Sequence, residues 1–300
     1  LANSVGFERW VAIFGAGYHP DGDPNSIDYK VTDDPAFSAK GRGIYMVDIT
    51  TGEVLAKKIF TPVDSFVSGA QLGFDEMRYA FASSPVVFDL DFDGFADVVY
   101  IGDLGGNLWK WVIRASGDDP INNGSTLDNV AQPQWPFRLF FRGSASTEPP
   151  PESQPGQAFD VTVHHQSFFF PPTGVFSRGE LVLAVGAGER DNPKGSESEY
   201  NDGIDSNNNH YYVLRDTNPL DVFDTSIDPI TGAYGESELA NFSAPGAMSC
   251  TQMKATKSGY YITGRDSEKF ITNSVVFMGD VFTGSFLPPD PSNSQSVCSG

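Results

Sequence analysis

The segment Pro85–Asn107 reads PVVFDLDFDGFADVVYIGDLGGN and contains the most specific pattern in the chain. Two runs rich in Val and aromatic residues, 86–88 and 98–100, enclose an acidic stretch, and a Gly-Asp-led turn follows. β-Branched and aromatic residues favour strands, and Gly, Asp and Asn favour turns. The segment therefore predicts a strand, an acidic loop, a second strand and a tight turn, which is the pattern of an all-β protein.

The acidic loop has the spacing of a calcium-binding loop. Its aspartates stand at positions 1, 3, 5 and 9, namely Asp89, Asp91, Asp93 and Asp97. Gly94 stands at position 6, where such loops turn sharply, and Phe95 at position 7 offers its backbone carbonyl. Position 12 is Tyr100 instead of the usual Glu, so the loop is shortened to nine residues. These five residues are the predicted Ca²⁺ ligands; Mg²⁺ prefers fewer protein ligands, and the alternative is an acidic, solvated turn.

Four segments repeat the combination of an apolar strand and a glycine. They are WVAIFGAG from Trp10, DVVYIGDLGGNLWKW from Asp97, LVLAVGAG from Leu181 and SVVFMGDVFTGSF from Ser274. Their starts are 87, 84 and 93 residues apart, close to twice the roughly 40–50 residues of a propeller blade. The predicted fold is a modified β-propeller of about seven blades with long loop insertions. A β-sandwich is the alternative.

No interior domain boundary is visible, so residues 1–300 are predicted to form a single β-propeller domain. The polar stretches 118–129 and 147–155 look like loop insertions, because strand patterns resume after each. Strand patterns continue almost to the end, and the turn-rich tail 288–300 lacks a closing strand. We therefore expect the chain to be a segment of a longer protein, with part of the ring outside it.

The composition excludes several classes of protein. The 300 residues include 31 Gly and 21 Pro, and only 19% are charged against an average near 25%, which disfavours a helical bundle. A net charge of −20 repels phosphate backbones, so nucleic acid is not an expected partner. No apolar run approaches the 18 residues of a membrane span. Cys250 and Cys298 could pair as one disulfide in an oxidising compartment or remain two free thiols.

Two other acidic clusters match the calcium template poorly. They comprise Asp21, Asp23, Asn25 and Asp28 in the first, and Asp202, Asp205, Asn207 and Asn209 in the second. The first has Pro24 and a misplaced glycine, and the second has oxygens without the spacing. Each is a weaker ion-site candidate, and the alternative is an ordinary loop rich in Asn and Asp.

Catalytic patterns are absent from the sequence. The four histidines form no His-Glu-x-x-His zinc motif, and there is no Gly-x-Ser-x-Gly elbow. The Gly-Ala-Gly segments lack the third glycine and following helix of a dinucleotide fingerprint, so they are interpreted as strand ends. Adjacent residues point to opposite faces of a strand, so one of His164 and His165 is expected to be buried and hydrogen-bonded. We predict no catalytic residue and no enzymatic activity.

The segment SSPVVFDLDFDGFADVVYIGDLGGNLWKW resembles the signature of PilY/PilC-type proteins of type IV pili. WVAIFGAGYHPDG, LVLAVGAGERDNP and SGYYITGRDSEKFITNSVVFMGDVFTGSFLP are similar to other parts of that family's C-terminal propeller, so the resemblance covers nearly the whole chain. It implies an extracellular propeller at the pilus tip, exported through the periplasm, that acts in pilus biogenesis, surface adhesion and motility. It also implies that calcium at this loop governs pilus extension and retraction, with minor pilins of the tip complex and a host or abiotic surface ligand as partners.

The chain departs from the family at two points. Ser267-Glu268-Lys269 replaces the family's Gly-Glu-Lys, and the region that usually precedes the propeller and often carries adhesive specificity lies outside the chain. An integrin-like, calcium-braced adhesin propeller is an alternative, although such domains repeat the motif in several blades. A quinone-dependent dehydrogenase propeller is a further alternative, but the vicinal cysteine pair and repeated Trp pattern of those enzymes are missing.

Overall fold

The computed structural model of the chain describes residues 9–23, 40–60, 77–113, 135–143, 165–177, 179–190, 193, 208–220, 233–243 and 249–288. The regular secondary structure of these residues is mostly β-strand. The exceptions are one α-helix, α2 (Cys250–Thr256), and the 3-10 turns η1 (Pro20–Gly22) and η6 (Glu236–Glu238). In the part of the chain so described, no helix has the length and apolar character needed to cross a membrane.

The strands form three larger sheets and one separate hairpin. Sheet A has the order β1 (Val11–Gly15), β2 (Gly43–Asp48), β3 (Val54–Ile59). Sheet B has the order β11 (Tyr234–Gly235), β7 (Phe137–Arg142), β6 (Asn107–Val112), β5 (Val98–Gly102), β4 (Val86–Phe88). Sheet C has the order β12 (Ala240–Asn241), β13 (Gly259–Thr263), β10 (His210–Asp216), β9 (Glu180–Gly186), β8 (Thr173–Ser177). The hairpin pairs β14 (Val275–Phe277) with β15 (Asp280–Phe282).

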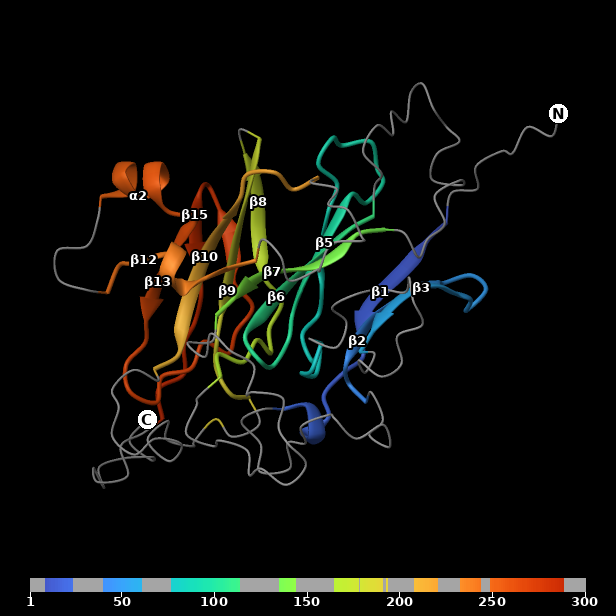
Figure 1. Cartoon of the computed structure of the whole chain (residues 1–300), viewed down its shortest axis with the longest axis horizontal. Helices are drawn as coiled ribbons and strands as arrows, with labels where there is room; N and C mark the ends of the chain where they lie inside the picture. The colour runs from blue at the N-terminus through green and yellow to red at the C-terminus, as the bar shows by residue number, and fades with distance from the viewer. Residues whose placement is uncertain are drawn as a thin grey trace, which may run out of the picture.

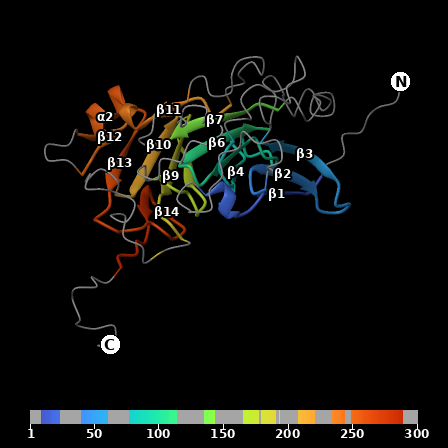
Figure 2. The ribbon, with the colours of Figure 1, turned by 60° about the horizontal axis from the view of Figure 1, so that its bottom comes forward.

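Sheet B lies between sheets A and C and is covered on both faces (Figures 1 and 2). Every residue of β5 and β6 is buried. Side chains alternate along these strands, so Val99 and Trp109 pack in one core with Ile44 of sheet A, whereas Tyr100 packs in another with Leu183 of sheet C. Strands that are buried on both faces need continuous apolar runs, which explains the sequence of β5 and β6.

The β14–β15 hairpin covers part of the other face of sheet C. Val281 of the hairpin packs against a small core formed by Ala184, Tyr211, Val213 and Phe270. The sheets are thus stacked face to face in the order sheet A, sheet B, sheet C and hairpin. This arrangement is that of successive blades in a propeller.

The four predicted strand–glycine segments are all confirmed as strands. β1 and β9 end at Gly15 and Gly186, and each pairs antiparallel with a strand that ends in an aspartate, β2 at Asp48 and β10 at Asp216. The other two segments are the β5–β6 and β14–β15 hairpins. The predicted insertions 118–129 and 147–155 lie outside the described residues, and the number of blades and the single domain over residues 1–300 stay predictions.

A buried ion pair joins sheets B and C. Lys110 Nζ on β6 lies 2.6 Å from Asp216 Oδ2 on β10, and the Tyr100 hydroxyl donates to the same oxygen at 2.6 Å. Lys110 Nζ also donates to the Asn218 carbonyl at 2.9 Å, and Asp216 Oδ1 accepts from the Asn218 N–H at 2.9 Å. Burial and the Asp216 carboxylate raise the pKa of Tyr100, so its hydroxyl remains a donor. These hydrogen bonds compensate the two charges for the loss of water.

Replacing Asp216 by alanine is expected to destabilise the fold strongly, because Lys110 then keeps its charge in the core without this carboxylate. The expected loss in free energy of unfolding is about 3–5 kcal/mol. The double variant Lys110→Met/Asp216→Leu should lose less, since it removes both charges. Urea unfolding followed by Trp fluorescence measures both values.

The matched control is Glu180→Ala, which breaks the more exposed pair between Glu180 and Arg215, where the nitrogen and oxygen lie 2.8 Å apart. An exposed pair contributes about 0–1 kcal/mol. If Asp216→Ala and Glu180→Ala cost the same, the buried pair does not stabilise the contact between sheets B and C.

Candidate metal centre

The acidic loop connects two antiparallel strands, as predicted. β4 and β5 pair with Phe88 opposite Val98, and the loop of residues 89–97 leaves and re-enters the sheet between them. The Asp97 N–H donates to the Phe88 carbonyl at 2.9 Å and closes the base of the loop. The two ends of the loop are therefore fixed by sheet B.

The turn inside the loop depends on Gly94. Its φ is +93°, a conformation that side chains rarely adopt, and no atom lies within 4 Å of the place where a Cβ would stand. The glycine at position 6 is thus required by the backbone and not by crowding. Phe92 also has a positive φ of 62°, and its side chain is exposed.

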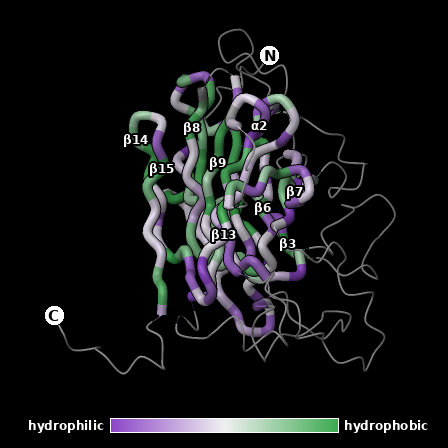
Figure 3. The backbone as a smooth tube through the Cα atoms, turned by 90° about the vertical axis from the view of Figure 1, so that its left-hand side faces the viewer, coloured by the Kyte–Doolittle hydropathy of each residue, from purple (hydrophilic) through white to green (hydrophobic). Residues whose placement is uncertain are grey.

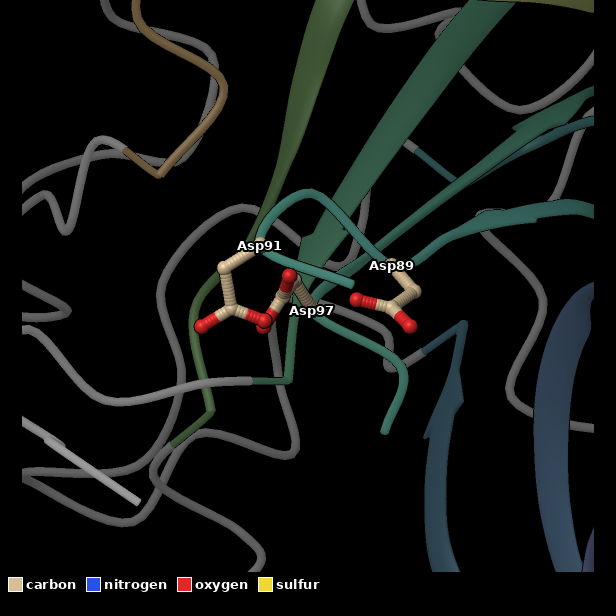
Figure 4. A group of neighbouring side chains, drawn as sticks. All are labelled: Asp89, Asp91 and Asp97. Carbon is tan, nitrogen blue, oxygen red and sulfur yellow. The ribbon is translucent and has the colours of Figure 1, made fainter. Parts of the chain in front are cut away.

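Three of the four predicted carboxylates converge in the loop. One oxygen from each of Asp89, Asp91 and Asp97 lies within 4.8 Å of the others (Figure 4). Among the described residues, this is the group of three His, Cys, Asp or Glu side chains whose ligand atoms lie close enough together to hold a metal ion. Asp97 is buried, Asp89 is half-buried and Asp91 is exposed, so the group has one side in the protein and one in solvent.

Backbone N–H groups hold the converging carboxylates in place. Asp89 accepts from the Asp93 N–H at 3.2 Å through Oδ1 and from the Gly94 N–H at 2.8 Å through Oδ2. Asp91 Oδ1 also accepts from the Asp93 N–H at 3.2 Å, and Asp97 Oδ2 accepts from the Leu90 N–H at 2.6 Å. These dipoles offset part of the repulsion between like charges, and the carboxylates retain oxygen lone pairs for a cation.

The fourth predicted carboxylate, that of Asp93, accepts a separate local hydrogen bond. Asp93 Oδ1 accepts from the Phe95 N–H at 2.8 Å, and Asp93 is not part of the three-residue group. Its ligand role and that of the Phe95 carbonyl stay predictions. The chemistry of the donor set fits Ca²⁺, because hard carboxylate oxygens are the ligands this ion takes and an open side leaves room for carbonyl and water ligands.

The first of the two weaker acidic clusters is described only in part. Asp23 is buried, and Asp21 Oδ2 lies 3.7 Å from His19 Nδ1. Asn25 and Asp28 lie outside the described residues.

The second weaker cluster is represented by Asn209 alone. Its side-chain amide is buried and donates to the Glu268 carbonyl at 2.9 Å, which is a structural contact. Asp202, Asp205 and Asn207 lie outside the described residues.

His165 is buried, as expected for one residue of the histidine pair, and its ring centroid lies 5.4 Å from that of Tyr79. His164 and Cys298 lie outside the described residues. The pairing of Cys250 with Cys298 stays open.

Another aspartate, Asp103, organises the turn between β5 and β6, and the sequence analysis did not single it out. Asp103 is fully buried, and its Oδ1 accepts from the N–H groups of Gly105 at 2.9 Å and Asn107 at 3.0 Å. Its Oδ2 accepts from Asn107 Nδ2 at 3.0 Å and Trp109 Nε1 at 2.8 Å. The segment GDLGGNLW supplies each of these donors at fixed spacing, so the signal was present in the sequence.

Residues 77–162 match the family model of the PilY1 beta-propeller domain. This part of the chain is similar to the PilY1 β-propeller domain. The matched range contains the acidic loop, Asp103 and the hairpin turn that Asp103 organises. The predicted propeller fold and the resemblance to PilY-type proteins are confirmed, whereas the number of blades stays a prediction.

Curated relatives share the PilY1 name. The chain is 32% identical over 114 residues to the type IV pilus biogenesis factor PilY1 homolog of Xylella fastidiosa, covering 37% of this chain and 6% of that protein. It is 27% identical over 138 residues to type IV pilus biogenesis factor PilY1 of Pseudomonas aeruginosa, covering 45% of this chain and 9% of that protein. The aligned region thus spans less than a tenth of either relative.

The crystal structure of the C-terminal domain of Pseudomonas aeruginosa PilY1 aligns with 82% of this chain and 50% of that chain, at 18% identity and a TM-score of 0.49.

The stability of the β5–β6 hairpin turn is expected to depend on pH through Asp103. Burial raises the pKa of Asp103 from 3.8 to about 6, and its four N–H donors oppose this rise. A folded state that binds the proton more tightly gains stability as the pH falls, so this contribution is present below about pH 4 and lost as the pH rises through 6. The shift corresponds to about 3 kcal/mol.

The measurement compares the wild type with Asp103→Asn in urea titrations between pH 4 and pH 7. The variant loses hydrogen bonds at every pH, but the advantage of the wild type should grow by up to about 3 kcal/mol toward the acidic end. A difference that is constant with pH would show that Asp103 does not titrate in this range.

Proposed function

We propose that this chain is the calcium-binding propeller of a type IV pilus tip protein and that it acts in pilus biogenesis. The convergence of Asp89, Asp91 and Asp97 within the range matched by the PilY1 propeller model is the observation that supports this function. The carboxylates come from both ends and the middle of one loop, so an ion bound there would cross-link the loop. Asp93 and the Phe95 carbonyl are the proposed additional ligands.

The role proposed for Ca²⁺ is to neutralise the loop and fix it to sheet B. Asp97 belongs to both structures, since its side chain faces the loop while its backbone is bonded to the sheet. The Ile113 N–H donates to the Asp97 carbonyl at 2.9 Å, and the Asp97 N–H donates to Phe88. A bound ion would therefore stabilise the arrangement of β4, β5 and the end of β6 together.

The exposed part of the loop is the proposed point of regulation. The side chains of Phe92 and Phe95 are 82% and 44% exposed, next to the carboxylates that bind the ion. An ion that orders the loop would also set the positions of these two rings. We propose that this coupling contributes to control of pilus extension and retraction and to surface adhesion, because a partner that contacts the rings would distinguish the two loop states.

The location and partners follow from the same proposal. The curated relatives are named type IV pilus biogenesis factors, which supports a place outside the cell at the pilus tip, reached through the periplasm. Minor pilins of the tip complex and a host or abiotic surface are the proposed partners. The proposed role is one of binding and not of catalysis.

Calcium titration of the purified chain by calorimetry tests the site. We expect one site that is lost or weakened at least tenfold in Asp91→Asn, because one carboxylate charge is removed from an exposed position with little effect on folding. Asp266→Asn, which removes an exposed aspartate outside the loop, is the matched control and should bind as the wild type does. Normal calcium binding by Asp91→Asn would refute the assignment.

A second assay separates the site from the biological role. Asp91→Asn and Asp266→Asn are introduced into the gene of the piliated host, and surface pili are counted by electron microscopy with and without a calcium chelator. Loss of calcium-dependent piliation in Asp91→Asn alone supports the role in biogenesis. If Asp91→Asn loses calcium binding but piliation is unchanged, the assignment of the calcium site stands and the proposed role in pilus biogenesis is refuted.

A further inference from the structure

Sheets A, B and C each have a strand that ends in a glycine. These glycines are Gly15 at the end of β1, Gly102 at the end of β5 and Gly186 at the end of β9. None of the three has a positive φ, so the backbone conformation does not require glycine there. A Cβ atom at any of them would instead lie 2.3–2.6 Å from an atom of a phenylalanine in another segment. The three glycines are therefore required by close packing.

The three phenylalanines occupy equivalent positions in the chain. Each stands five residues before the strand that begins the next sheet or hairpin, with Phe81 before β4, Phe168 before β8 and Phe270 before β14. Phe81 belongs to the core between sheets A and B, and Phe168 to the core between sheets B and C. Phe270 belongs to the small core between sheet C and the hairpin, where β14 lies beside β8 (Figure 3). Each phenylalanine thus lies between the sheet that precedes it and the one that follows.

Backbone hydrogen bonds hold each phenylalanine against the preceding sheet. The Phe168 N–H donates to the Asp103 carbonyl at 3.1 Å, and the Phe270 N–H donates to the Ala187 carbonyl at 2.9 Å. Both acceptors directly follow the glycine of the contact. The Phe81 N–H donates at 2.7 Å to a carbonyl in the loop before β2, which is also part of sheet A.

The residue before each phenylalanine bonds in the other direction. Its carbonyl accepts from a residue just beyond the second strand of the sheet or hairpin into which the segment leads. The donors are the N–H groups of Leu104 for Ala80 and Gly188 for Ser167, each at 3.0 Å, and Phe286 for Lys269 at 2.8 Å. Two consecutive residues of one segment are therefore bonded to two neighbouring sheets.

We propose that these contacts are a repeated conformational device, the Gly–Phe joint, that fixes each sheet on the next. The glycine lets the phenylalanine approach the end of the strand more closely than any side chain would allow, and the two backbone bonds hold the neighbouring sheets at this point. Because a new strand starts five residues later, the joint also determines that this strand begins the adjacent sheet. Sheet B, which carries the acidic loop, has a joint on each side, at Gly15 and at Gly102.

Urea unfolding of Gly102→Ala tests the close packing. The added methyl group would meet Phe168, so the folding equilibrium constant should fall at least about tenfold, as it does when cores are overpacked. Gly235→Ala is the matched control, because Gly235 has a φ of −115° and no atom within 3.6 Å of its Cβ position. The control should unfold as the wild type does. If the two variants unfold alike, the contact at Gly102 does not constrain the fold and the proposal is wrong.

Double variants test whether each glycine acts through its own phenylalanine. Gly102→Ala should cost less in a Phe168→Ala background, because a segment without its ring can move away from the added methyl group. In a Phe270→Ala background, which alters a different joint, the cost of Gly102→Ala should be unchanged. Equal costs in the two backgrounds would overturn the pairing of Gly102 with Phe168.

Native-state hydrogen exchange tests whether a joint acts only on the sheets that it connects. Gly186→Ala should speed exchange in the β14–β15 hairpin and leave β1 and β2 unchanged, whereas Gly15→Ala should speed exchange in β1 and β2 and leave the hairpin unchanged. Exchange that rises equally in all strands, or in none, would show that these are ordinary core contacts and would refute the joint.

Discussion

The burial of sheet B on both faces is the constraint on which the rest of the structure depends. Because β5 and β6 have protein on each side, almost every position must be apolar, and the sequence satisfies this with alternating Val, Tyr, Leu and Trp. Lys110 is the exception on the side of sheet C. Its charge is tolerated because Asp216 comes from the facing sheet and Tyr100 from the adjacent strand. The same ion pair that satisfies this lysine therefore also fixes how sheets B and C meet.

The acidic loop uses the rigidity of sheet B. Like charges on a free loop would separate, but here the loop starts and ends on paired strands, and backbone N–H groups donate to all four of its carboxylates. Asp97 is the residue at which the two structures join, since it is buried, accepts from Leu90 inside the loop and is bonded to Phe88 through its backbone. The calcium proposal follows from this position, because an ion that contacts Asp97 acts on the sheet as well as on the loop.

Local patterns predicted most of the fold and much of the candidate site. Strands, hairpins and the turn at Gly94 follow from residue types close in sequence, and the Asp spacing predicted the convergence of Asp89, Asp91 and Asp97. The position of Asp93 was not predictable from spacing, because its carboxylate can bond either to an ion or to the nearby Phe95 N–H. The pairing of Lys110 with Asp216 joins residues 106 apart, and no local pattern indicates it.

In the first strand, β1, the sequence pattern and the observed burial of the side chains differ. Val11, Ala12, Ile13 and Phe14 form a continuous apolar run, which is the pattern of a strand with protein on both faces. In the structure, Val11 and Ile13 pack on sheet B, whereas Phe14 is 45% exposed and stacks on Tyr45, at 6.0 Å between ring centroids. The alternate positions of a surface strand carry polar residues when water is their lasting environment. The first strand therefore keeps the apolar pattern of a strand with protein on both faces, although Phe14 is partly exposed.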